Sequence, residues 1–225
     1  MSMPFYVAPE QLMKDKADYA RKGIARGRSL VAVEYADGIL LAAENPSAVL
    51  HKLSEIYDRI AFAGVGKYSE FDALRRQGVQ FADVRGYQYS REDVDARSLA
   101  NAYAQMMNQI FTHELKPLEV EILVAEVGLA EGEDQLFHIL YDGTVVDEEG
   151  FSVLGGEADP IAERLKTAYA AGLSLGDAVK VATAALAGTE RTLSAPELEV
   201  AVLSRSNGRR AFRRITGDDL AALMA

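Results

Sequence analysis

The sequence predicts an α+β fold, a four-layer αββα sandwich in which two stacked antiparallel sheets are flanked by helix pairs. Three observations carry this prediction. Apolar segments are interrupted by turn dipeptides typical of β-hairpins, at Asp37-Gly38, Asp142-Gly143 and Asn207-Gly208. Runs such as "VEILVAEV" and "LEVAVLS" are apolar on both alternating faces, so each sheet needs cover on both sides. The helical segments come in adjacent pairs, which supplies that cover.

The chain opens with a tail and a helix. Residues 1–9 contain two prolines among apolar residues and are expected to form a flexible tail. Residues 10–22 show a helical pattern that ends before Gly23, which predicts a leader helix. Residues 10–225 are enough for one substantial core, so a single domain that includes the leader helix is expected.

Strands and helix pairs alternate after the leader. The hairpin at Asp37-Gly38 is followed by a third strand over residues 60–65. Helices are predicted over residues 67–78, 91–113, 159–171 and 174–187, with a short one after Thr216. Capping signals mark three of the starts: Asp159-Pro160, Ser174 with Asp177, and Thr216 with Asp219.

Composition excludes several classes of function. The net charge of −10 argues against a nucleic-acid partner, and the basic strip Arg209 to Arg214 is expected to be a solvated strand face. The chain has no cysteine, which excludes disulfides, thiolate metal sites and a cysteine nucleophile. It has no signal-peptide pattern and no apolar run that would span a membrane, so a cytoplasmic protein is expected. His51, His113 and His138 lack metal-ligand spacing, and no metal or cofactor is expected.

Several long stretches match one known family in order. They are "ARKGIARGRS", "YADGILLAAENPS", "HKLSEIYDRIAFAGVGKYSEFDALRRQGVQFADVRGYQYSREDV", "KPLEVEILVAEV" and "RRAFRRITGDDL". With these motifs the chain resembles the bacterial, actinobacterial-type proteasome α subunits, non-catalytic members of the N-terminal nucleophile hydrolase fold family. The resemblance covers residues 10–223, nearly the whole chain.

The resemblance implies a structural subunit of the 20S core particle rather than an enzyme. It implies a heptameric ring of α subunits that templates assembly with a β ring, where the threonine-type proteolysis takes place. Unfolded substrates would pass through an axial pore, gated by the tail residues Met3, Pro4, Phe5, Tyr6 and Val7. Ala17, Tyr19 and Ala20 of the leader helix would contact the leader of the neighbouring α subunit.

The resemblance also implies a pocket between neighbouring α subunits for the C-terminal tail of a ring-shaped ATPase. It places Lys52 there, where the ammonium would pair with the terminal carboxylate of the tail. The other residues expected at this pocket are Gly64, Val65, Gly66, Gly27 and Asp18. Glycines would let the backbone of the tail approach closely.

An active hydrolase is the alternative function. Hydrolases of this fold use a threonine or serine at a free N-terminus, because the α-amine, with a pKa of roughly 8, is the general base. Ser29 opens the first strand, and Glu44 and Lys52 follow in the order of a β-type site, so cleavage before Ser29 would create such a nucleophile. Gly27 lies one residue too early for the glycine that precedes the nucleophile in self-processing precursors. Ser29 is therefore expected to remain internal and inert.

Overall fold

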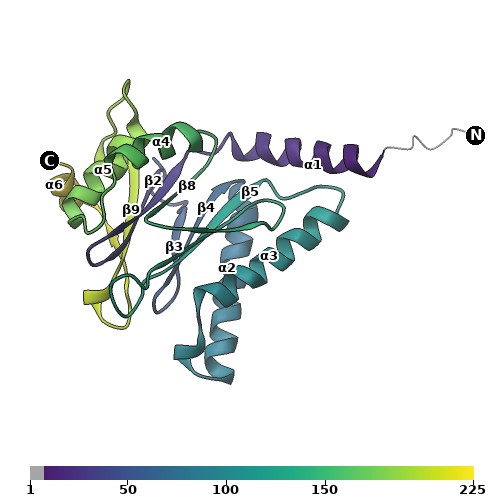
Figure 1. The fold of residues 1–225 in the computed structure, drawn as a ribbon, viewed down its shortest axis with the longest axis horizontal. Coiled ribbons are helices and arrows are strands. Elements are labelled where there is room, and N and C mark those ends of the chain that lie inside the picture. Colours follow the sequence, from purple (N-terminus) through teal and green to yellow (C-terminus); the bar gives the residue numbers. More distant parts are fainter. Residues whose placement is uncertain (1–7) are drawn as a thin grey trace, which may run out of the picture.

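Two stacked antiparallel sheets form the centre of the protein (Figure 1), for which the computed structural model describes residues 8–225. Sheet A contains, in spatial order, β10 (Phe212–Ile215), β9 (Leu198–Ser204), β2 (Gly38–Glu44), β1 (Leu30–Tyr35) and β8 (Phe151–Leu154). Sheet B contains, in spatial order, β3 (Leu53–Tyr57), β4 (Ile60–Gly66), β5 (Val120–Glu126), β6 (Gln135–Ile139) and β7 (Val145–Glu148). Every neighbouring pair is antiparallel.

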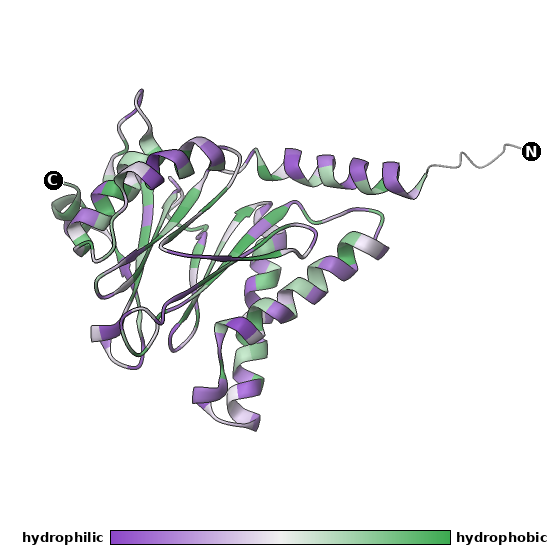
Figure 2. Ribbon diagram, viewed as in Figure 1, coloured by the Kyte–Doolittle hydropathy of each residue, from purple (hydrophilic) through white to green (hydrophobic). Residues whose placement is uncertain are grey.

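Helices cover the outer face of each sheet. Sheet B is covered by α2 (Tyr68–Gln88) and α3 (Ala96–His113). Sheet A is covered by α4 (Ala158–Ala168) and α5 (Leu175–Ala187), with α6 (Gly217–Met224) packed against α5. Short 3-10 turns lie at Arg91–Asp93, Ala195–Glu197 and Arg205–Asn207. Figure 2 shows long hydrophobic stretches in the strands and mixed colours in the helices, as expected for amphipathic helices on buried sheets. The predicted αββα sandwich is confirmed.

Strand alternation sorts the apolar side chains into three cores. Along β1, Leu30 and Ala32 belong to the core between the sheets, whereas Val31 and Val33 face the core under α4 and α5. The third core lies between sheet B and the pair α2 and α3, with Tyr103 fully buried in it. Because both faces of the central strands are buried, strands such as β2 and β9 are continuous apolar runs, whereas the edge strands β3 and β7 contain polar residues.

The leader helix α1 (Pro9–Ile24) lies over one end of the sandwich and extends beyond it (Figure 1). Ala20 and Ile24 are buried in the core between the sheets. Lys16 Nζ donates to the carbonyl oxygens of Phe111, Thr112 and Glu114, at 3.0, 3.4 and 2.7 Å, and so caps the C-terminal end of α3.

These contacts correct one expectation about the leader. Ala20 is fully buried in its own subunit and is therefore not available to a neighbour. Ala17 packs on the same core, while Tyr19 stays half exposed, with Lys116 Nζ 5.6 Å from its ring centre. Of the three residues expected to contact the neighbouring leader, only Tyr19 has the exposure for it.

The three expected hairpins and most helices are present, and the differences have local causes. β3, absent from the expected elements, pairs with β4 through a turn at Asp58-Arg59 that lacks glycine. The helix expected to end at residue 78 continues to Gln88. Gly78 lies inside it because a Cβ there would come within 1.9 Å of Tyr103 Oη, which donates to the Leu74 carbonyl at 2.9 Å.

The capping predictions had three different outcomes. Ser174 Oγ accepts from the Asp177 backbone N–H at 3.1 Å and donates to its carboxylate at 2.6 Å, which confirms that cap. The N-cap of α4 is Glu157, so Asp159 lies in the first turn instead of capping it. Thr216 is the N-cap residue of α6, so the predicted helix start is confirmed, but its side chain makes no capping hydrogen bond and the predicted capping box is wrong.

Candidate functional site

Ser29, Glu44 and Lys52 meet at the foot of the leader helix, but each is already engaged within the chain. Ser29 is almost fully buried, and a Cβ on Gly155 would lie 2.9 Å from its Oγ, so backbone closely covers the hydroxyl. Glu44 accepts hydrogen bonds from the guanidinium groups of Arg28 and Arg191, the latter at 3.1 and 3.2 Å. The Ser29 nitrogen is an amide of an intact chain, and its lone pair is delocalised into the carbonyl group, so it cannot act as a general base. In this form of the chain the arrangement is a closed polar cluster.

Lys52 lies immediately before β3, and its backbone N–H, backbone carbonyl and side-chain ammonium each form a hydrogen bond. Its backbone N–H donates to Glu199 Oε2 at 2.8 Å, and its carbonyl accepts from the Gly64 N–H at 3.1 Å. Its ammonium donates to the Arg28 carbonyl at 2.5 Å. Burial lowers the pKa of Lys52 to about 8, although the carboxylates of Glu199 and Glu44 partly compensate. The side chain is half-buried, so the ammonium is partly desolvated, and no carboxylate among residues 8–225 contacts it directly.

Gly27 and the end of β4 lie directly against each other beside this ammonium. A Cβ on Gly27 would come within 2.7 Å of Val65 Cγ1 and 2.9 Å of the Gly66 nitrogen. Gly66 has φ +110°, and a Cβ there would lie 2.0 Å from the Glu119 carbonyl. The chain that leaves the leader helix therefore crosses β4 backbone to backbone.

Of the remaining expected residues, Gly64 is hydrogen-bonded to the Lys52 backbone, whereas Asp18 lies apart from the cluster. A Cβ on Gly64 would meet the Phe71 ring at 2.8 Å, so its glycine is required by packing inside the chain. Asp18 lies on the half-exposed side of α1, 3.5 Å from Arg21 Nη1, six residues or about 9 Å along the helix before Ile24. No contact among the described residues links Asp18 to Lys52. The expected gate residues, Met3 to Val7, lie outside the described residues.

Sequence reasoning missed the residues that hold Lys52 in place. Arg28 supplies both the carbonyl under the ammonium and one partner of Glu44. Glu199 supplies the acceptor for the Lys52 N–H. The available signal for Glu199 was its isolation, because it is the one carboxylate inside the apolar run "LEVAVLS". A charge at such a position requires partners.

The described residues give no indication of other chemistry at the site. No grouping of His, Asp and Glu side chains among residues 8–225 has the geometry to hold a metal ion. Over the same part of the chain, each helix is too short or too polar to cross a membrane.

Comparison with known proteins identifies the family. The family model for proteasome subunits matches residues 24–203. The chain is 62% identical over 220 residues to a proteasome subunit alpha of Acidimicrobium ferrooxidans, a match that covers 98% of this chain and 95% of the relative. It is 57% identical over 234 residues to that of Kineococcus radiotolerans, covering 100% and 99% of the two chains, and 56% identical over 227 residues to that of Thermobifida fusca, covering 100% and 91%. The chain therefore belongs to the proteasome subunit family, among the α subunits of actinobacterial type.

Proposed function

We propose that this α subunit forms a heptameric ring that stacks on a catalytic β ring in the cytoplasm, docks a ring ATPase at Lys52, and gates the pore with its N-terminal tail. The observation that carries the proposal is the Lys52 ammonium, which lies half-buried at the foot of the leader helix and has a carbonyl oxygen as its hydrogen-bond partner among residues 8–225. A C-terminal carboxylate is the complementary group for such an ammonium. The contact would contribute about 1.5–3 kcal/mol.

The surroundings of Lys52 favour an anionic ligand. The Arg28 guanidinium lies close enough to oppose the charge on Lys52 and is half exposed. Arg191, also about half exposed, adds a second guanidinium beside Glu44. Glu44 and Glu199 offset part of this positive charge at Lys52, and Glu197 lies near both arginines. Neither Glu44 nor Glu199 contacts the ammonium directly, so an arriving carboxylate would give it a charged partner.

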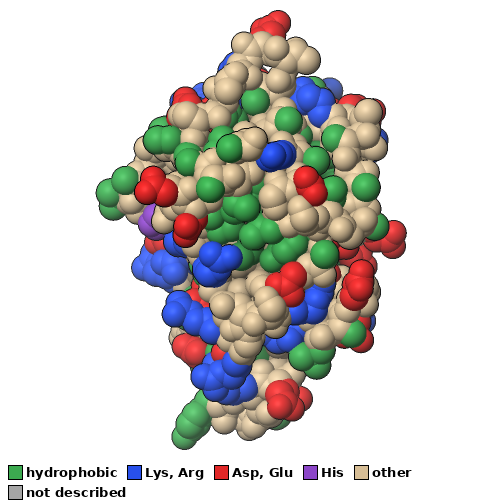
Figure 3. Space-filling model, turned by 90° about the vertical axis from the view of Figure 1, so that its left-hand side faces the viewer, with side chains coloured by type: hydrophobic (Ala, Val, Ile, Leu, Met, Phe, Trp, Pro, Cys, Tyr) green, Lys and Arg blue, Asp and Glu red, His purple; other side chains and the backbone are tan. Residues whose placement is uncertain are grey.

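Two open sides of the sandwich support a head-to-tail ring. One side is formed by the free edges of β3 and β10, and the other by β7 and β8. The first side has an excess of two basic residues. Its carboxylates are Asp58, Asp72, Glu55 and Glu199, and its six arginines are Arg75, Arg76, Arg209, Arg210, Arg213 and Arg214. The segment from Tyr141 to Phe151 on the second side contains four carboxylates and no basic residue. Figure 3 shows several Lys and Arg side chains close together at the lower left of the view, with Asp and Glu side chains among them and further Asp and Glu side chains along the right border.

Opposite charges on opposite sides suit a closed ring. A ring contact joins two unlike surfaces of identical subunits, so a basic side would meet the acidic side of the next copy. Lys52 immediately precedes the edge strand β3. The docking pocket would then lie where two subunits meet, as the family resemblance implies.

The distal half of α2 suits a contact with the β ring. Val84, Tyr87 and Tyr89 are exposed there by 47%, 92% and 73%, and Leu129 of the β5–β6 loop is exposed by 83%. Large apolar side chains exposed together indicate a protein contact. They lie at the opposite end of the strands from the leader helix, where a second ring would stack (Figure 1).

The test is the variant Lys52→Ala in the assembled α and β particle. ATPase-stimulated degradation of a folded substrate is expected to fall about tenfold or more, because the carboxylate loses its charged partner. Cleavage of small peptides by the particle alone is expected to stay unchanged. Lys166→Ala, which removes an exposed lysine from α4, is the matched control. Normal stimulation in Lys52→Ala would refute the docking role, and loss of both activities would indicate misassembly.

The alternative hydrolase is tested by the mature N-terminus. The closed cluster around Ser29 favours an unprocessed chain, so the denatured mass should include the leader. A mature chain that begins at Ser29 and cleaves peptides without a β subunit would establish the enzyme instead.

A further inference from the structure

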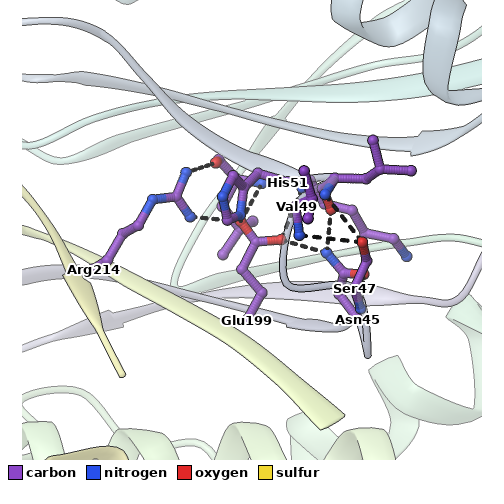
Figure 4. Close-up of polar contacts among 9 residues, drawn as sticks. Asn45, Ser47, Val49, His51, Glu199 and Arg214 are labelled. Atoms are coloured by element: carbon purple, nitrogen blue, oxygen red, sulfur yellow. Dashed lines mark hydrogen bonds and ion pairs between the residues drawn. The ribbon is translucent and has the colours of Figure 1, made fainter. Parts of the chain in front are cut away.

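Glu199 is a buried carboxylate that accepts hydrogen bonds from the loop that precedes β3. It lies on β9 of sheet A with 9% of its surface exposed. Its oxygens accept from Asn45 Nδ2 at 2.8 Å, from the Lys52 N–H at 2.8 Å and from the Leu53 N–H at 3.2 Å (Figure 4). One side chain thus binds both ends of the loop of residues 45–53.

The charge of Glu199 is balanced from a third element. Arg214 on β10 donates to Glu199 Oε1 at 2.6 Å and to the Leu53 carbonyl. His51 Nδ1 lies 3.2 Å from the same oxygen. A buried carboxylate costs several kcal/mol unless it is paired and fully hydrogen-bonded, and here both conditions are met. The cluster is therefore well enough satisfied to be rigid.

The loop is also closed on itself between these anchors. Asn45 Nδ2 donates to the Leu50 carbonyl at 2.7 Å, and the Ser47 N–H donates to Asn45 Oδ1 at 3.1 Å. The Leu50 N–H donates to Ser47 Oγ at 3.0 Å. Val49 at the tip is 78% exposed. An exposed loop with this many internal bonds has its backbone fixed although its tip is in solvent.

We propose that Glu199 is a positioning residue for Lys52, fixing the backbone of the lysine so that its ammonium stays over the Arg28 carbonyl and faces a docking carboxylate. Lys52 has a long flexible side chain, so an anchored backbone limits where its ammonium can be. Glu199 acts from sheet A across to β3 of sheet B, and through Lys52 it connects sheet A to the foot of the leader helix. The inference rests on the proposed docking function of Lys52.

The test compares Glu199→Gln with Glu55→Gln in the intact α and β particle. Glu55 forms a bidentate pair with Arg210 at 2.9 and 2.6 Å on the same open side, but no bond links it to the loop, which makes it the matched control. Native mass spectrometry and melting temperature report assembly. Amide hydrogen exchange of residues 45–53 measures how well the backbone of the loop is fixed. The affinity of a synthetic peptide that copies the C-terminal tail of the ring ATPase measures docking.

The titration of Lys52 separates positioning from simple electrostatics. It is followed by NMR of 13C-methylated lysines, with Lys52→Ala used to assign the signal. If Glu199 acted only by its charge, its removal would lower the pKa of Lys52 further, because the carboxylate opposes the effect of burial. If it positions the loop, Lys52 is released to water and its pKa rises toward the ordinary value.

Positioning predicts that Glu199→Gln keeps the assembled particle, speeds exchange of residues 45–53, raises the pKa of Lys52 and weakens tail-peptide binding about tenfold. Glu55→Gln should leave the exchange of residues 45–53, the pKa of Lys52 and tail-peptide binding unchanged. A Glu199→Gln particle with unchanged loop exchange or a lowered Lys52 pKa overturns the inference. If Lys52→Ala binds the tail peptide normally, the docking function fails instead, while exchange and titration still decide whether Glu199 positions Lys52.

Discussion

Docking through Lys52 should depend on pH in a way that the structure predicts quantitatively. The pKa of Lys52 in the free pocket is about 8, lowered because burial disfavours the ammonium. A carboxylate placed against the ammonium favours the charged form and raises that pKa. Docking therefore takes up a proton at high pH, and affinity is constant well below pH 8 and falls above it.

The size of the effect follows from the fraction of charged pockets. With a pKa of about 8, about nine in ten free pockets carry the ammonium at pH 7 and about one in ten at pH 9. Affinity should therefore fall about tenfold between these two values. The α-carboxyl group of the tail does not titrate in this range, since its pKa is roughly 3.5.

The assay is fluorescence anisotropy of the labelled tail peptide with the α and β particle from about pH 6.5 to pH 9.5. Lys52→Arg is the control, because a guanidinium keeps its charge throughout and should bind with weaker but pH-independent affinity. A wild-type affinity that stays constant up to pH 9.5, or an equal decline in Lys52→Arg, would refute the reasoning.

Three further predictions concern the leader, the ring and the tail. Lys16→Met should lower the free energy of unfolding by about 1–3 kcal/mol, because three carbonyls at the end of α3 lose their donor. Chemical denaturation measures this loss. Lys22→Met, on the exposed side of α1, is the control and should have little effect. Arg209→Glu and Glu149→Lys should each reduce the yield of rings in native mass spectrometry, because each places like charges opposite one another. The double variant should recover the yield. If reversing the charge at either residue alone leaves the yield unchanged, the two sides do not meet. Deletion of residues 1–7 should speed peptide entry into the assembled particle, and an unchanged rate would contradict gating by the tail.

The fold was predictable because its signals are local. Gly38, Gly143 and Gly208 adopt φ values of +140°, +87° and +75°, the left-handed region that the turn dipeptides predict. β3 was missed because "LSEIY" is short and half polar and its turn at Asp58-Arg59 has no glycine. The helix predicted over residues 67–78 continues beyond Gly78, and no local pattern reveals that this glycine packs against the Tyr103 hydroxyl.

The site was predictable only in part. Of the residues that the resemblance placed in one pocket, the structure bonds Gly64 to Lys52 and packs Gly27 against Val65 and Gly66, but it leaves Asp18 apart. The surrounding polar network depends on pairs far apart in the chain: Glu199 and Asn45 are 154 residues apart. No local pattern encodes such a pair, so the partners of Lys52 emerge only once the two sheets are stacked.

The hydrogen bonds from Lys16 to the end of α3 hold the leader helix from Lys16 onward, while its first two turns extend into solvent. From Lys16 onward the helix is fixed by three carbonyls and by the apolar core. Before Lys16, residues 8–15 are exposed apart from the half-buried Met13. A sideways force on the first two turns would therefore bend the helix near Lys16 and leave its junction with β1 undisturbed. In the proposed ring, these two turns, with Leu12 44% exposed, would be the part of the leader that an adjacent copy displaces most easily.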